Sequence, residues 1–360
     1  MKVRDTYFVK AQTLTDVGTV SIPILKGLKI QHLRVKLGAT NGATSNTVGK
    51  ICGMISKIEV VDGSDVLHSL SFRQEQAVNA FQNYFFPRKE LSAGLSVAIF
   101  EEAMVNFGMG FKDRHLYLDT SRFSNPQLKI TYALTISATA GFATGTGALS
   151  VIARIIEDQA PPYAGFVMAK EVDSWATAAS GDHTTLLALD YPYLALVVAA
   201  LKTTVDPRTL ITNFKLQRDA GSFIDYDLTS EDLLSDNIAM CGLFEEDFRP
   251  LNPGTTFAWL SDLYSKTEAW MGVPGATAKG TITTAVGEAI GGIMTTGETA
   301  DLQTVKVRGA APHASFYLPF GDGQTPEDAL NPAGLKELKL IKSQAVGAAA
   351  GTVVALQIRQ

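Results

Sequence analysis

The fold is decided by a stretch that occurs twice in the chain. The first copy consists of Tyr117-Leu118, Asn125-Pro126 and a long, almost uncharged segment that ends at Arg154. The second copy consists of Tyr317-Leu318, Asn331-Pro332 and a similar segment that ends at Arg359. The same landmarks in the same order predict an internal duplication, and a repeat of this length indicates a domain copied in tandem.

The repeat extends towards the N-terminus. Gly63-Ser64 and Gly221-Ser222 follow strand-like segments and lie 158 positions apart. Behind each comes a helix start with a hydroxyl residue followed by acids or amides, namely Ser71-Phe72-Arg73-Gln74-Glu75 and Thr229-Ser230-Glu231-Asp232. Such residues satisfy the free N–H groups of a helix N-terminus.

The spacing of later landmarks predicts an insertion in the second copy. Phe100-Glu101-Glu102 and Phe244-Glu245-Glu246 lie 144 positions apart, whereas Tyr117 and Tyr317 lie 200 apart. The difference places about 56 additional residues between Glu246 and Tyr317. An excursion of this length is typical of a functional or partner-contacting loop.

Length and composition favour two domains and exclude several classes of protein. A chain of 360 residues exceeds the usual size of one hydrophobic core, and 46% hydrophobic residues suffice for two. The formal charge of −5 gives no general attraction to nucleic acid or anionic lipid. Cys52 and Cys241 occupy different places in the repeat, so no disulfide framework is expected. No apolar segment of a secretory signal follows Met1.

One uncharged segment, Ile130 to Ala153, is long enough to span a bilayer. A Gly- and Thr-rich run, Gly141 to Gly147, interrupts it, and β-branched residues are frequent on both sides. This pattern favours two paired strands, Lys129–Ile136 and Ala148–Ile155, over a transmembrane helix.

The remaining pattern predicts the local elements. Strands are expected at Ile30–Leu37, Ile51–Val61, Tyr191–Leu201 and Leu210–Gln217, and helices at Phe72–Phe85 and Val97–Val105. Pro161-Pro162 forms the natural boundary, because proline removes backbone donors and neither sheet continues through it. The predicted division is an N-terminal arm at 1–20, a first module at 21–160, and a second at 161–360 with a loop insertion at about 247–315.

Strand-rich modules of this size, with a few short helices, predict an all-β fold of sandwiches or barrels. Two tandem eight-stranded jelly-roll β-sandwiches fit best: in each, two four-stranded sheets face each other. The strand order stays open at this level.

Motifs for catalysis and cofactor binding are missing. The sequence contains no phosphate loop, no complete G-x-G-x-x-G, no G-x-S-x-G, no C-x-x-C and no H-E-x-x-H. The five histidines are scattered, so we expect each at the surface or the edge of a core and none as a metal ligand, at positions His32, His68, His115, His183 and His313.

Two groups of acidic residues, Glu101-Glu102 and Glu245-Glu246-Asp247, have several interpretations. They are expected on a solvated surface, because charges are rarely buried unless paired. The alternatives are general acid–base chemistry or a divalent ion held between subunits. A Ser-His-Asp set can be assembled only on paper, from Asp173-Ser174, Asp182-His183 and Ser180, because proximity in the sequence gives no geometry. No catalytic, cofactor-binding or metal-binding residue is therefore assigned, and no enzyme activity or cofactor is expected.

The remaining candidates concern contacts. Trp259 and Trp270 are expected to anchor an interface or a core, with a carbohydrate-stacking platform as the alternative. Arg122-Phe123 and Arg154 are not part of a basic run with interleaved aromatic residues, so sequence-specific nucleic acid binding is not expected.

The landmarks carry a resemblance to a known family. The block Tyr117 to Ile130 and its counterpart Phe316 to Pro332, with the Pro-Pro junction and the large insertion, resemble the double jelly-roll major capsid proteins of tailless icosahedral viruses. This is the lineage of tectiviruses and adenoviruses, and the block is similar to that of its bacteriophage members.

The resemblance implies a structural role. Three chains would form a homotrimer with six similar modules, a pseudo-hexameric capsomer that tiles an icosahedral virion shell. Partners would be neighbouring capsomers, penton and minor capsid proteins, and an internal viral membrane under the inner face in some members. The protein would be made in the host cytoplasm and located in the virion.

Two other functions remain open at this point. One is a two-domain β-sandwich protein that binds or cleaves glycans through Trp259, Trp270 and the glutamate pairs. The other is a virion spike or receptor-binding protein of the same structural class.

Overall fold

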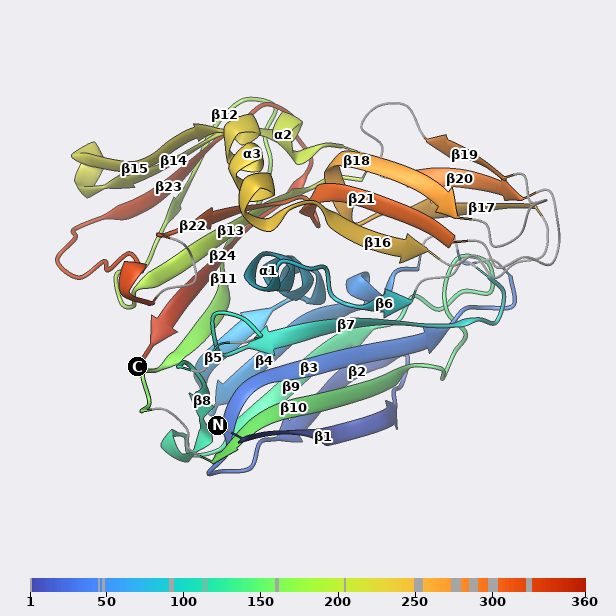
Figure 1. The fold of residues 1–360 in the computed structure, drawn as a ribbon, viewed down its shortest axis with the longest axis horizontal. Coiled ribbons are helices and arrows are strands. Elements are labelled where there is room, and N and C mark those ends of the chain that lie inside the picture. The colour runs from blue at the N-terminus through green and yellow to red at the C-terminus, as the bar shows by residue number, and fades with distance from the viewer. Residues whose placement is uncertain are drawn as a thin grey trace.

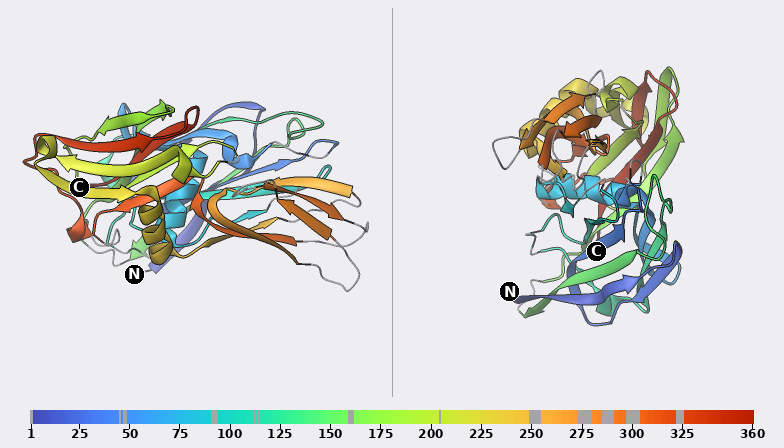
Figure 2. Two further views of the ribbon diagram at one scale, coloured as in Figure 1. Left: turned by 90° about the horizontal axis from the view of Figure 1, so that it is seen from above. Right: turned by 90° about the vertical axis from the view of Figure 1, so that its right-hand side faces the viewer.

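The computed structural model is shown in Figures 1 and 2. It describes residues 2–44, 46, 49–90, 94–111, 113, 115–158, 162–203, 205–248, 255–272, 280–284, 291–296, 304–321 and 326–360.

The first half of the chain forms two facing sheets. One has the strand order β1 (Lys2–Thr13), β10 (Ala148–Asp158), β3 (Lys29–Thr40), β7 (Ala98–Asn106) and β6 (Lys89–Glu90), with β8 (Leu118–Asp119) also paired to β3. The other has the order β2 (Val17–Pro23), β9 (Pro126–Ala133), β4 (Ile55–Asp62) and β5 (Asp65–Leu70). Between them lies one apolar core, to which Leu33, Val35 and Val151 contribute fully buried side chains.

The second half repeats this arrangement strand for strand. Its first sheet has the order β11 (Phe166–Ala176), β24 (Ala350–Arg359), β13 (Tyr193–Leu201) and β22 (Ser315–Pro319). Its second has the order β12 (Gly181–Leu186), β23 (Leu338–Gln344), β14 (Ile211–Arg218) and β15 (Phe223–Thr229). A second core with Leu196, Phe214 and Phe316 fills the space between them. The predicted fold class, two tandem eight-stranded jelly rolls, is confirmed.

The two jelly rolls are joined edge to edge. β5 of the first lies parallel to β11 of the second, with Ser69 opposite Lys170, so that two four-stranded sheets become one of eight strands. A third apolar cluster, which includes Phe81, Val167 and Tyr317, packs between the two halves. Figure 1 shows α1 between the lower and the upper jelly roll.

Helices are short. The α-helices are α1 (Phe72–Asn83), α2 (Pro207–Leu210) and α3 (Ser230–Cys241), and the 3-10 turns are Ile51–Gly53, Thr120–Arg122, Asp219–Gly221 and Pro326–Asp328. The predicted helix starts are confirmed: Ser71 caps α1 and Thr229 caps α3, each accepting a hydrogen bond from the backbone of the helix's first turn.

An asparagine clamp repeats in both jelly rolls. The Asn79 side chain of α1 donates to the Met104 carbonyl of β7 and accepts from the Met104 N–H, both at 2.6 Å. The Asn237 side chain of α3 makes the same pair of bonds with Tyr317 of β22, at 2.7 and 2.8 Å. Asn79 and Asn237 lie 158 positions apart, the spacing of the two Gly-Ser landmarks.

The clamp sets the alignment of the two copies. In the first jelly roll, Met104 lies opposite Arg34, Arg34 opposite Ile152, and Ile152 opposite Tyr7 on successive strands. In the second, Tyr317 lies opposite Val197, Val197 opposite Val354, and Val354 opposite Glu171. Tyr317 is therefore the counterpart of Met104, and the sequence-based match of Tyr317 with Tyr117 is wrong. The match of Phe100-Glu101-Glu102 with Phe244-Glu245-Glu246 is also wrong, since the former lies in β7 and the latter in the insertion. A match of two or three residues can occur by chance, whereas the pairing of residues on hydrogen-bonded strands aligns the two copies over their whole length.

The strands between α3 and β22, which we call the insertion from here on, form two small sheets. One has the order β16 (Phe244–Phe248), β21 (Thr304–Pro312) and β18 (Leu263–Gly272), and the other β17 (Thr255–Leu260), β20 (Gly291–Thr296) and β19 (Gly280–Thr284). Figure 2 shows them projecting together from one end of the molecule.

Two local predictions are wrong. Val97–Val105 is predicted as a helix but lies in β7, because its apolar residues complete the sheet next to β3. The segments around Lys129–Ile136 and Ala148–Ile155 are strands, as expected, but they do not pair with each other: β9 pairs with β2 and β4, and β10 with β1 and β3. In a jelly roll these consecutive strands belong to opposite sheets.

Residues 1–20, assigned to an arm by the sequence, contain β1 and part of β2. β1 pairs along its length with β10, β2 pairs with β9, and Phe8, Val9 and Val20 pack against the first core. Within the described part of the chain, no helix has the length and apolarity needed to cross a membrane.

Candidate functional site: a buried charge network between the jelly rolls

The most concentrated group of polar side chains lies where the first jelly roll meets the insertion. The first jelly roll contributes Lys50 and Cys52 at the turn before β4, Lys89 of β6 and Glu101 of β7. The second half contributes Glu246 of β16, Asp262 at the start of β18 and His313 between β21 and β22. Segments more than 150 residues apart in sequence therefore share one buried site.

Asp262 is the centre of the network. Its Oδ1 accepts from the Lys50 ammonium at 2.8 Å and its Oδ2 from the Lys89 ammonium at 2.9 Å. Lys89 also contacts Glu246, whose Oε2 accepts from the Asp262 backbone N–H at 2.9 Å. Asp262 is 3% exposed and Glu246 2%, so these charges are shielded from water.

Glu101 extends the network into the first jelly roll. Its carboxylate accepts from the Cys52 N–H at 3.2 Å and from the Gln76 side chain at 3.0 Å. The Gln76 carbonyl oxygen lies 2.8 Å from Nε2 of His313. Gln76 of α1 thus connects a carboxylate of the first jelly roll to a histidine of the second half.

The pKa values follow from burial and from these partners. Burial by itself raises the pKa of Asp262, but Lys50 and Lys89 outweigh it and hold the pKa well below its ordinary value. Burial lowers the pKa of Lys89, but Asp262 and Glu246 reverse the effect and raise it. Burial raises the pKa of Glu101 and lowers that of His313 to about 3. The network therefore holds charged ammonium–carboxylate pairs beside a neutral imidazole at neutral pH.

The prediction of solvated acidic groups is wrong for two of the five acids. Glu101 and Glu246 are buried, whereas Glu102, on the opposite side of its strand from Glu101, is partly exposed and Glu245 and Asp247 are exposed. Adjacent residues of a strand point to opposite faces, and this alternation was the signal that a buried partner was required. The surface or core-edge prediction for the histidines is likewise wrong for His32, His68 and His313, which are buried.

Three side chains of the site have the types that bind metals. One ligand atom each of Cys52, Asp262 and His313 lies within 4.8 Å of the others. Both carboxylate oxygens of Asp262 already face ammonium groups, and burial raises the pKa of the Cys52 thiol and disfavours the thiolate that a metal requires. We therefore interpret the group as an ion-pair network and not as a metal centre.

The structure brings together two members of the Ser-His-Asp set. Asp173 Oδ2 lies 2.8 Å from His183 Nε2 and also accepts from the Thr185 hydroxyl. Lys342, fully buried, approaches the same oxygen at 3.4 Å, and Trp175 stacks on His183 with ring centroids 4.5 Å apart. Among the residues that the structure describes, neither Asp173 nor His183 forms a hydrogen bond with a serine side chain, and their contacts join β11 to β12 and β23.

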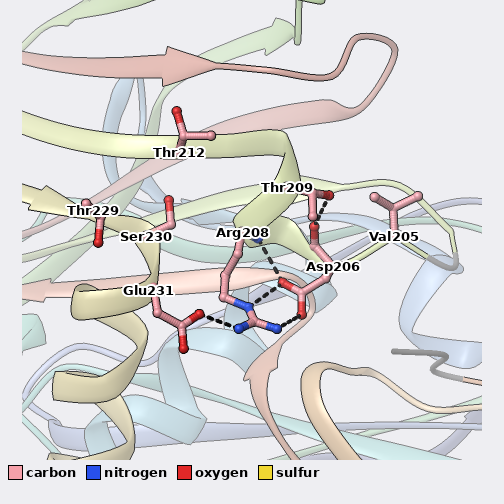
Figure 3. A pocket seen from close by; sticks show the side chains of 8 residues that line it. All are labelled: Val205, Asp206, Arg208, Thr209, Thr212, Thr229, Ser230 and Glu231. Carbon is pink, nitrogen blue, oxygen red and sulfur yellow. Dashed lines mark hydrogen bonds and ion pairs between the residues drawn. The ribbon is translucent and has the colours of Figure 1, made fainter. Parts of the chain in front are cut away.

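A surface hollow of about 650 Å³ lies beside α2 and the start of α3, and Figure 3 shows the side chains that line it. Arg208 reaches both carboxylate oxygens of Asp206, at 3.0 and 2.7 Å, and also contacts Glu231. The Ser265 hydroxyl donates to Asp206 at 2.7 Å. The charged groups of the hollow satisfy one another.

The arginines that were candidates for nucleic acid binding make contacts inside the chain. Arg122 lies over the Tyr163 ring at 3.8 Å, and Arg154 pairs with Asp5 at 2.8 Å. Cys52 and Cys241 are both free thiols. The side chains of Trp259 and Trp270 lie outside the described part of the structure.

Comparison with known proteins identifies the fold. No family model and no curated protein sequence matches the chain. An atomic structure of Sulfolobus Turreted Icosahedral Virus matches with a TM-score of 0.63 and 12% identity, over 99% of this chain and 90% of that one. The crystal structure of the major capsid protein of the same virus (STIV) matches with a TM-score of 0.61 and 10% identity, over 99% and 96%.

A viral protein from a different host agrees. The major capsid protein P2 from bacteriophage PM2 matches with a TM-score of 0.55 and 10% identity, over 100% of this chain and 98% of that chain. Since these matches span both jelly rolls and their junction, the chain has the double jelly-roll fold of these viral major capsid proteins.

Proposed function

We propose that the chain is a major capsid protein, a structural subunit that associates with copies of itself to form the shell of an icosahedral virion. The observation that supports this most is the match over nearly the full length of this chain and of viral major capsid proteins. The fold alone does not specify function, so the chemistry of the described residues provides the second argument. The most polar buried sites are internally paired and join strands of one chain.

The finer parts of the proposal concern assembly. The capsomer is a homotrimer of pseudo-hexagonal outline, in which each chain contributes a first jelly roll up to residue 160 and a second at 161–360 with a loop insertion at about 247–315. Its further partners are penton and minor capsid proteins and, under the inner face, an internal membrane. The virion is the site of action, and the chain has no catalytic function, cofactor or metal. A permanent interface in such a capsomer buries more than about 2,000 Å².

Light scattering coupled to size-exclusion chromatography tests the proposal. We expect a particle of about three times the 38.5 kDa chain mass, and pseudo-hexagonal tiles in negative-stain images. A stable monomer at high concentration would contradict the proposal. Glycan binding by such a monomer would instead favour the carbohydrate-binding alternative.

A further inference from the structure

One junction between jelly rolls is formed inside the chain, and its counterpart is left open. Inside the chain, β5 of the first jelly roll joins β11 of the second. By position in their sheets, the counterpart of β5 is β15 and the counterpart of β11 is β1. β15 and β1 each end their sheet and lie on opposite sides of the molecule in Figure 1. A terminal strand presents unpaired N–H and C=O groups that can pair with another chain.

Both open strands also present apolar surface. Tyr7 of β1 is 52% exposed, and Phe223 and Ile224 of β15 are 58% and 43% exposed. Phe223 and Ile224 are adjacent, and contiguous apolar surface marks an interaction site more often than single scattered side chains do. A second copy of the chain is the partner that offers the matching edge.

The internal junction supplies the register of the open one. Inside the chain, Ser69 lies opposite Lys170. Ser69 lies two residues before the helix cap Ser71, and Asp227 lies two residues before the helix cap Thr229, so Asp227 is the counterpart of Ser69. Along the aligned ladders, the counterpart of Lys170 is Thr6, which faces Ala153 as Lys170 faces Ala355. The same junction between copies therefore sets Asp227 opposite Thr6.

The charges of the two halves are complementary. Residues 1–160 contain 17 Lys and Arg against 13 Asp and Glu, a net charge of +4, whereas residues 161–360 contain 14 against 23, a net charge of −9. At the open edges, several charges are paired inside the chain: Lys2 and Arg4 with Glu157, Asp225 with Arg218, Asp227 with Lys215, and Glu231 with Arg208 and Lys266. Lys10 of β1 and Asp232 at the start of α3 continue the asymmetry, because they carry opposite charges on the two open edges. Opposite charge on two surfaces favours their association and sets its orientation.

A side-chain contact at the junction inside the chain also has counterparts at the open edges. Inside the chain, Gln74 of α1 contacts Glu171 of β11. Their counterparts are Asp232, 158 positions after Gln74, and Tyr7, which occupies the place of Glu171 in the ladder. The Lys10 ammonium lies 5.5 Å from the centre of the Tyr7 ring. Among the described residues, neither Lys10 nor Asp232 forms an ion pair, and the junction between copies brings them together.

We propose that β15 of one copy lies parallel and adjacent to β1 of the next copy, with Asp232 beside Tyr7 and Lys10. The contact is heterologous, and it repeats until the ring of copies closes. This inference rests on the proposed capsid function and specifies which surfaces associate: the basic edge of the first jelly roll against the acidic edge of the second.

A charge exchange tests the contact. Lys10→Glu and Asp232→Lys each place like charges at the junction, and we expect each to weaken association by about tenfold or more. The double variant restores the opposite charges and should recover association. Lys26→Glu makes the same charge change at an exposed position outside β1 and should leave association unchanged. Light scattering over a concentration series measures each state, and thermal unfolding verifies that each variant is folded.

A cysteine pair tests the register directly. Thr6→Cys with Asp227→Cys should form disulfide-linked oligomers under oxidising conditions, whereas Thr13→Cys with Asp227→Cys, at the far end of β1, should not. If the wild-type chain associates but neither the charge exchange nor the Thr6/Asp227 pair has an effect, the inference is overturned and the proposed function stands. If the wild-type chain stays monomeric at every concentration, both are overturned.

Discussion

Removal of the charge of Asp262 should loosen the junction between the first jelly roll and the insertion. Asp262→Asn keeps the size of the side chain and one acceptor oxygen, but it leaves Lys50 without its carboxylate at 2.8 Å. Lys89 keeps Glu246 as a partner. The main cost is therefore the loss of the carboxylate that two ammonium groups, those of Lys50 and Lys89, share in a site shielded from water.

The magnitude follows from the burial of the pair. The side chains of Asp262 and Lys89 are 4% and 3% exposed and that of Lys50 is 20% exposed, so water replaces little of the lost carboxylate. Removal of one partner of a buried ion pair costs about 3–5 kcal/mol, whereas an exposed pair contributes about 0–1 kcal/mol. We expect the free energy of unfolding of Asp262→Asn to fall by about 3–5 kcal/mol.

Urea unfolding followed by circular dichroism and tryptophan fluorescence measures this loss. Asp247→Asn is the matched control: it removes an exposed carboxylate of the same insertion, 3.9 Å from Lys306, and should cost less than about 1 kcal/mol. The reasoning is refuted if Asp262→Asn and Asp247→Asn lose the same stability.

The pH dependence gives a second check on Asp262. Its folded-state pKa lies well below the ordinary value of 3.8, so its contribution is present above pH 3.8 and is lost as the pH falls through the folded pKa. The difference between wild type and Asp262→Asn should therefore be constant near neutral pH and shrink only below about pH 3.8.

Three other predictions concern the second jelly roll and the repeat. Asn79→Ala and Asn237→Ala each remove two hydrogen bonds between a side chain and the backbone of a buried strand, so both should lose about 2–4 kcal/mol in urea unfolding; a loss in only one of them would contradict the equivalence of the clamps. Gly351→Ala places a methyl group 2.3 Å from the Trp175 ring and should cost about 1–3 kcal/mol, detected as a lower unfolding temperature. Burial lowers the pKa of Lys342 to about 8 from 10.5, so the unfolded state binds more protons between these values and stability should rise with pH across that window. Lys342→Met should abolish this rise, and an unchanged pH profile would show that Lys342 is solvated.

Several elements could be predicted because their signals are local. The capped helix at Phe72 and the apolar strand within Tyr191–Leu201 each follow from neighbouring residues, and the structure has α1 at Phe72–Asn83 and β13 at Tyr193–Leu201. The strand at Ala98–Asn106 could not be distinguished from a helix, because a short apolar run fits both periods and only the neighbouring β3 decides.

The candidate site depended on contacts that are not visible in the sequence. The alternation of Glu101 with Glu102 indicates that one carboxylate faces the interior, but it does not identify Lys50, Lys89 or Gln76 as the surrounding groups. These residues come from a turn, an edge strand and a helix, and the junction of the two halves assembles them. The histidine predictions were wrong for the same reason.

By itself, the sequence determined that this protein is duplicated and strand-rich, because periodicity, caps and turns act over a few residues. Only the tertiary structure decided which strands pair, which copy of each landmark is equivalent and which charges are buried. Strand pairing and burial join residues more than a hundred positions apart, and the free energy of such contacts depends on packing that no local pattern encodes.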